Sequence, residues 1–125
     1  MEENRIAREV VDAALEVHRT LGPGLLESVY RRSLALELGL RDLKCAEEVP
    51  LNASYKGLKF GTAYRLDLEV SGLIIVEVKS VDTLLPVHAA QLLSYLRLAN
   101  RRLGLLINFH VPLLKDGIKR VVNKL

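Results

Sequence analysis

Two charged side chains interrupt the most apolar segment of the sequence. Residues 73–79 have the sequence Leu-Ile-Ile-Val-Glu-Val-Lys, which places Glu77 and Lys79 two positions apart. Side chains two apart on a strand project from the same face. Burying either charge alone is costly unless it is paired or bound to a ligand. The spacing fits an ordinary ion pair on an exposed strand face, but the apolar neighbours favour a functional site.

A neighbouring segment adds a carboxylate to this pair. In residues 60–70, Asp67 and Glu69 alternate with apolar positions, which predicts opposite faces for the two kinds of side chain. The apolar positions of this strand, expected to share one face, are Leu66, Leu68 and Val70. A tight turn at Ser71-Gly72 predicts a hairpin that brings Asp67 close to Glu77.

Convergent carboxylates next to a lysine indicate metal-assisted chemistry. Two carboxylates repel each other unless a cation lies between them. Mg²⁺ (or Mn²⁺) binds carboxylate oxygens and keeps waters and positions for a substrate phosphate. Lys79 would orient the attacking water or stabilise the developing charge. Asp67, Glu77 and Lys79 therefore predict Mg²⁺-dependent hydrolysis of a phosphodiester.

Two predicted helices carry further candidates. Glu27 and Tyr30 lie on one stripe of the first of them, and Glu27 either faces the site or is a first-turn acid favoured by the helix dipole. Gln91 and Tyr95 are spaced i, i+4 on the second and share a face with His88. Both can hydrogen-bond a phosphate or carboxylate, although Tyr95 also suits a core position. His88 is interpreted as a helix-start residue without a ligand role.

These residues need a framework of helices and strands, which the sequence pattern predicts over most of the chain. The glycine at 39 is expected to end the second helix, and Lys56-Gly57 to form a turn. The predicted helices cover 6–21, 25–38 and 86–98, and the predicted strands cover 45–51, 53–58, 60–70, 73–79, 103–109 and 118–122. This order predicts an α/β or α+β fold with helices on a mixed sheet, in one domain spanning residues 1–125.

Composition limits the remaining possibilities. With one cysteine, Cys45, the chain has no internal disulfide and no Cys-rich zinc site, and this thiol is expected to be a small core filler. No apolar run is long enough to span a membrane, and the start of the sequence lacks the features of a secretory signal. We therefore expect a cytoplasmic protein without membrane contact. The net charge of +3 permits an anionic partner, and the absence of Trp argues against a platform for stacking single-stranded bases.

Two of these motifs resemble those of one group of nucleases. Asp67, followed by Glu77 and Lys79, resembles the D…(D/E)xK signature of the PD-(D/E)xK nuclease superfamily. Gln91 and Tyr95 resemble the QxxxY motif of its RecB-like branch. The proline in the name of the superfamily is absent here, a common departure, since a leucine precedes Asp67.

A third motif points to a smaller family within that superfamily. Gly24, Glu27 and Tyr30 resemble the motif of the GxxExxY protein family. The resemblance extends from the first predicted helix to the strand at 105–109 and the turn at 115–117, which is nearly the whole chain. The occurrence of three motifs in this order within 125 residues makes the resemblance specific.

The resemblance implies a restriction-endonuclease-like core, in which a four-stranded mixed sheet is flanked by helices and carries an acidic site at one edge. The roles it implies are metal ligands at Asp67, Glu77 and Glu27, a catalytic lysine at Lys79, and a supporting pair at Gln91 and Tyr95. It does not by itself establish activity, because one fold hosts several functions.

Two functions follow as hypotheses. The first is an Mg²⁺-dependent nuclease acting on nucleic acid, with DNA favoured over RNA. The alternative is a catalytically silent nuclease-fold module that binds nucleic acid or a protein partner, because the basic residues of the chain are scattered. A homodimer is compatible with both, and the segment 103–109 is expected to supply either its interface or the core.

Overall fold

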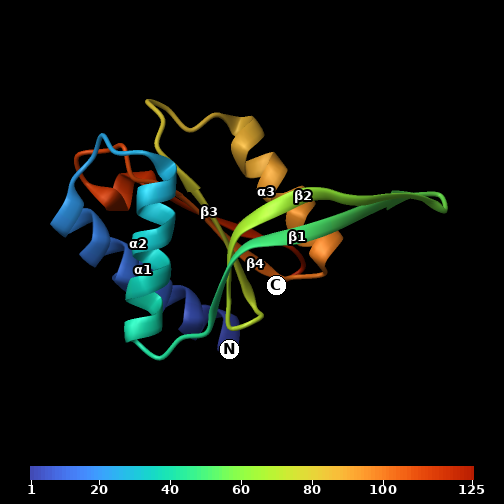
Figure 1. Cartoon of the computed structure of the whole chain (residues 1–125), viewed down its shortest axis with the longest axis horizontal. Helices are drawn as coiled ribbons and strands as arrows, with labels where there is room; N and C mark the ends of the chain where they lie inside the picture. Colours follow the sequence, from blue (N-terminus) through green and yellow to red (C-terminus); the bar gives the residue numbers. More distant parts are fainter.

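Helices and strands follow one another over all of residues 1–125 in the computed structural model (Figure 1). In chain order they are α1 (Glu2–Leu21), α2 (Glu27–Leu40), β1 (Cys45–Tyr55), β2 (Leu58–Val70), β3 (Ile74–Lys79), α3 (Pro86–Ala99), β4 (Leu103–Asn108), the short 3₁₀ helix η1 (Leu114–Gly117) and β5 (Ile118–Val122). Apart from the separate strand predicted at 53–58, this is the predicted order of helices and strands. None of the helices combines the length and the hydropathy needed to cross a membrane.

The strands form one mixed sheet in sequence order, β1-β2-β3-β4-β5. Only β3 and β4 are parallel, and the other neighbours are antiparallel. A parallel pair needs a crossover connection, and α3 provides it. The predicted mixed sheet flanked by helices is confirmed. It has five strands rather than four, because β5 pairs along the free edge of β4.

The segment 53–58, predicted as a strand of its own, is instead the end of a long hairpin. β1 continues to Tyr55, and β2 begins at Leu58. The turn between them is Lys56-Gly57, as predicted, with φ values of 47° and 87°. Positive φ at both central residues is the geometry of two-residue hairpin turns that match the strand twist.

The end of α2 also differs from the prediction. Gly39 remains helical, and the helix ends at Leu40. Asp42 adopts the left-handed conformation at φ 61°, while the Leu43 N–H donates to the Leu38 carbonyl. An aspartate tolerates this conformation because its short polar side chain bonds locally, so it takes the position expected for the glycine.

Two apolar clusters lie on the two faces of the sheet. Helices α1 and α2 cover one face, and α3 covers the other (Figure 1). Gly104 of β4 lets α3 approach closely, because a Cβ there would lie 3.0–3.1 Å from atoms of Leu92. All six residues of β4 are buried, so this strand belongs to the core and is not an interface. Cys45 packs at the edge of the first cluster, where burial raises the pKa of its thiol to about 11, as fits a filler.

Strand β2 pairs with β1 on both sides of Asp67 but has β3 as a second neighbour on one side alone. It pairs with β3 only over residues 68–70. Leu68 packs in the cluster under α1 and α2, whereas Leu66 packs in the cluster under α3. The prediction that Leu66 and Leu68 share one face is therefore wrong. Strict alternation is expected only while a strand keeps the same neighbours, and β2 separates from β3 at this point.

Candidate active site

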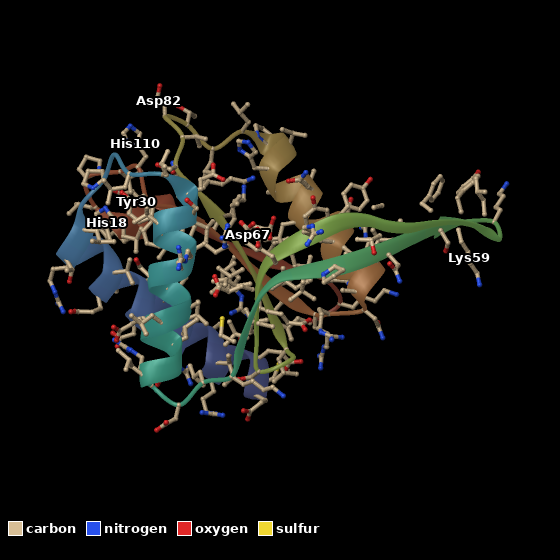
Figure 2. All side chains as sticks on the ribbon, viewed as in Figure 1. His18, Tyr30, Lys59, Asp67, Asp82 and His110 are labelled. Carbon is tan, nitrogen blue, oxygen red and sulfur yellow. The ribbon has the colours of Figure 1, made fainter.

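The candidate site lies where β2 and β3 separate, at the base of the long hairpin (Figure 2). The Asp67 N–H donates to Oε2 of Glu77, at 2.8 Å. The Val78 N–H donates to Oδ2 of Asp67, also at 2.8 Å. Each carboxylate thus binds the backbone of the opposite strand. The two bonds replace the ladder hydrogen bonds that are lost as the strands diverge, and they hold the two acids together, as predicted from the hairpin.

Burial disfavours the ionised form of both acids. The Glu77 side chain is 5% exposed, and burial together with the nearby Asp67 charge raises its pKa to about 8. Burial also raises the pKa of Asp67, opposed by its bond from Val78 and by the charge of Lys79. Two carboxylates in this state gain stability from a cation or a proton.

One oxygen of each carboxylate remains free to bind a ligand. Oδ1 of Asp67 and Oε1 of Glu77 have no hydrogen-bond partner within the protein, and neither is fully buried. Hard divalent ions such as Mg²⁺ bind one or two carboxylates and keep several waters. No group of three or more His, Cys, Asp or Glu side chains is arranged to hold a metal ion. The donor set that fits a cation is therefore the pair of acids.

Lys79 ends β3 on the same side as Glu77. It is half-buried, its carbonyl accepts a hydrogen bond from Phe109 N–H at 2.9 Å, and it takes part in none of the ion pairs of the protein. Its charge lowers the pKa of both Asp67 and Glu77, which places the ammonium within electrostatic reach of them. The structure therefore brings together the three residues that the sequence singled out first.

Glu27 is exposed at the first position of α2, close to the end of β3. Its Oε2 lies 3.4 Å from the Ser80 N–H, and the Ser80 hydroxyl donates to the Leu25 carbonyl at 2.7 Å. The charge of Glu27 raises the pKa of Asp67 and Glu77. It therefore acts on the site from its rim and also fits a first-turn acid.

The other residues of that motif fix the turn before α2. Tyr30 is fully buried and stacks on Phe109, with ring centroids 4.5 Å apart. Its hydroxyl donates to the Gly22 carbonyl at 2.5 Å and accepts from the Leu25 N–H at 3.1 Å. Gly24 has φ 95°, a conformation that favours glycine. The glycine and the tyrosine of this motif thus position Glu27 at the end of β3.

The predicted pair on α3 is only partly assembled. Tyr95 is buried, and burial followed by the Glu77 charge raises the pKa of its hydroxyl, so Tyr95 faces the acids. Gln91 is exposed, and its side chain makes no hydrogen bond within the protein. His88 accepts a hydrogen bond from the Leu85 N–H at 3.0 Å, which confirms its interpretation as a helix-start residue.

Three residues around the site were not predicted. Arg31 of α2 lowers the pKa of Asp67. The Tyr64 ring lies 5.4 Å from the Tyr95 ring. Asn108 is 2% exposed and bonds both the N–H and the carbonyl of Val81, which fixes the loop after Lys79. The sequence did contain a sign that Asn108 is unusual, because it is a polar residue at the end of an apolar strand. Glu77 was found from a similar sign, as a charged residue within an apolar strand.

Comparison with known protein families gives a match that covers nearly the whole chain. The sequence profile of the PD-(D/E)XK nuclease superfamily matches residues 4–121. No curated protein and no solved structure gives a significant match. The matched range includes every element from α1 into β5, and therefore the paired carboxylates and Lys79.

Proposed function

Because the chain belongs to the PD-(D/E)XK nuclease superfamily, we propose that residues 1–125 form one domain that hydrolyses phosphodiester bonds in nucleic acid. We propose DNA rather than RNA as the substrate, and Mg²⁺ or Mn²⁺ as the ion. The fold agrees with this family, since a mixed sheet flanked by helices is the restriction-endonuclease-like arrangement.

The reciprocal binding of Asp67 and Glu77 is the observation that carries the proposal. The two acids are held together by hydrogen bonds to the opposite strands, although burial raises the pKa of each and the Asp67 charge raises that of Glu77 further. A cation bound between the two carboxylates would offset the cost of burying them side by side. Asp67 and Glu77 would hold the ion through their free oxygens, with Glu27 adding negative charge from the rim.

The remaining residues would act on the substrate side of the site. When bound, the metal ion supplies charge stabilisation to the phosphate and lowers the pKa of a bound water. Lys79, free of ion pairs, would orient the attacking water or stabilise the charge that develops on the phosphate. Tyr95 would support the acids from α3 through its hydroxyl, and Gln91 would contact the substrate from the exposed side of the same helix.

The decisive experiment is a digestion panel with and without Mg²⁺ and Mn²⁺, on single-stranded, double-stranded, nicked and branched DNA and on RNA. We expect the wild type to cleave DNA only with a divalent ion. Lys79→Ala should lower the rate by roughly two to three orders of magnitude while the protein stays folded and still binds Mn²⁺. Lys115→Ala, an exposed lysine on η1, is the matched control and should cleave at the wild-type rate. Full activity in Lys79→Ala would indicate a contaminating nuclease.

A catalytically silent module remains the second candidate function. The exposed Gln91 and the lack of a third acid grouped with Asp67 and Glu77 favour it. Such a module would cleave none of the substrates with any ion and would still retain nucleic acid, or a protein partner, in a binding assay.

We also propose a finer placement of the chain, in the GxxExxY family of the RecB-like branch. The turn before α2 supports this placement, because Gly24 and Tyr30 of the motif fix its conformation and thereby position Glu27. A cytoplasmic location is proposed from the single, unpaired cysteine. A homodimer stays part of the proposal, with an interface outside the buried strand β4, and light scattering at several concentrations tests it.

A further inference from the structure

The hairpin of β1 and β2 extends well beyond the rest of the molecule (Figure 1). Its outer part, residues 52–65, is called the arm here. Within the arm, the strands pair only with each other, since β2 meets β3 only from residue 68 onward. Every arm residue is exposed except Ala53, which is half-buried. The arm therefore presents both of its faces to solvent and adds little to the core.

The arm carries the whole net charge of the chain. It contains Lys56, Lys59 and Arg65 and no acid. The chain has 18 Lys and Arg against 15 Asp and Glu, so the residues outside the arm hold 15 of each and are neutral. None of the three arm cations forms an ion pair within the protein. Figure 2 shows Lys59 near the tip of the arm, far from Asp67.

The exposed aromatic residues of the protein are also confined to the arm. The chain has four Tyr and two Phe. The three outside the arm are buried, whereas Tyr55, Phe60 and Tyr64 are 63%, 57% and 45% exposed. Interleaved cationic and aromatic side chains, free of acids, complement nucleic acid, because cations contact its phosphates and apolar side chains contact base edges such as the thymine methyl group in the major groove.

The base of the arm joins the candidate active site. Tyr64 packs against Tyr95, whose hydroxyl senses the charges of Glu77 and Asp67. Arg65 precedes Asp67 by two residues on the same strand. From Lys59 to Asp67 the extended chain covers roughly 25 Å. A ligand seated along the arm would therefore reach from its tip to the paired carboxylates.

We propose that the arm holds double-stranded nucleic acid, as a β-ribbon placed in the major groove with its lysines on the phosphates. A two-stranded ribbon fits this groove, which is about 12 Å wide. A second copy of the chain is a poorer occupant, because two acid-free arms repel each other and the neutral remainder offers them no excess of negative charge. The inference rests on the proposed function only in taking nucleic acid as the ligand.

The test is the binding of a fluorescent duplex of about two helical turns, measured by anisotropy in EDTA, where metal-dependent cleavage is blocked. We compare the wild type with Lys56→Ala/Lys59→Ala and with the matched control Lys115→Ala/Lys119→Ala, two exposed lysines near β5. The arm variant should bind roughly tenfold more weakly, and its slope of log affinity against log salt should be shallower by about 1.8. The control should bind within about twofold of the wild type, as expected for charges without phosphate contacts.

A third variant separates the aromatic contribution from the charge. Phe60→Ala should weaken binding and leave the salt slope unchanged, since it removes no cation. Equal losses in the two lysine pairs would overturn the inference, and so would displacement by single strands as effective as by duplex. A lower molecular mass of the arm variants in light scattering would also overturn it, in favour of a second copy. Because the binding assay is run in EDTA, its result does not depend on whether the protein cleaves nucleic acid. Likewise, a negative binding result would not affect the outcome of the cleavage assay.

Discussion

The two halves of strand β2 differ in almost every physical property. The outer half, residues 58–65, is exposed on both faces, cationic and free of acids. The inner half, residues 66–70, alternates buried leucine and valine with half-buried acids and joins the sheet. The boundary falls just before Asp67. One strand therefore connects a surface suited to holding a polyanion with a buried pair of acids suited to acting on it.

This division teaches that one strand can carry its cations and its acids in separate segments. Phosphate brought by the cationic half would be repelled by the acids of the inner half unless a divalent ion or a proton neutralised them. Binding and chemistry should thus respond separately to mutation, and the following variants test how separate they are.

The largest effect is expected at the acids. Asp67→Asn should lower the cleavage rate by roughly a thousandfold, because the variant loses a carboxylate that the metal requires. It should also abolish the rise in melting temperature that Mn²⁺ gives the wild type by binding only the native state. Asp116→Asn, an exposed acid on η1, is the control. A Mn²⁺ shift of wild-type size in Asp67→Asn would exclude Asp67 as a ligand.

The two halves should also differ in stability. Leu68 is fully buried, whereas Leu58 is 59% exposed at the tip of the arm. Leu68→Ala should lower the free energy of unfolding by about 2–5 kcal/mol, and Leu58→Ala by less than about 0.5 kcal/mol. Urea denaturation followed by circular dichroism measures both. A similar loss in the two variants would mean that the arm packs against the body in solution.

A pH dependence of stability should arise at Glu77, the partner of Asp67 in the inner half. The folded protein keeps the Glu77 proton up to a pKa of about 8, whereas the unfolded chain releases it near 4.5. Between these values the unfolded state binds fewer protons, so the stability of the metal-free protein falls as pH rises. Glu77→Gln should remove roughly 1–3 kcal/mol of this fall. Urea unfolding in EDTA at pH 5 and pH 8 measures it, and an unchanged slope in the variant would contradict the assignment.

The smallest effect is expected at the rim. Glu27→Gln should cost about 0.3–1 kcal/mol of stability through the helix dipole and weaken Mn²⁺ binding far less than Asp67→Asn does. Calorimetric titration of both variants with Mn²⁺ makes the comparison. Unchanged Mn²⁺ affinity would leave Glu27 with its structural role at the start of α2 alone.

The inner half was largely predictable from the sequence, because burial leaves a periodic signal. Leu68 and Val70 alternate with Asp67 and Glu69, and the charge of Glu77 stands out against its apolar neighbours. Those patterns gave the hairpin and the paired acids. The failure at Leu66 has a physical cause, since alternation predicts a shared face only while a strand keeps one neighbour, and β2 leaves β3 there.

The arm left no such signal. A strand that is exposed on both faces needs no alternation of apolar and polar residues, and the pattern therefore predicted a separate strand at 53–58. The three cations of the arm form one group only in the complete hairpin. On α3 the i, i+4 spacing was also insufficient. Positions four apart differ by about 40° around a helix, enough to bury Tyr95 and expose Gln91 at the edge of the same face.

The reciprocal bonds of Asp67 and Glu77 have a consequence for how the family can diverge. Each acid accepts a hydrogen bond from a backbone N–H of the opposite strand at the point where β2 and β3 separate. Selection for the fold alone would therefore preserve both acids after catalysis is lost. Lys79 makes no side-chain hydrogen bond or ion pair in the protein, so only chemistry constrains its identity. Among homologues, replacement of this lysine beside two retained acids should therefore mark the lineages that have abandoned cleavage.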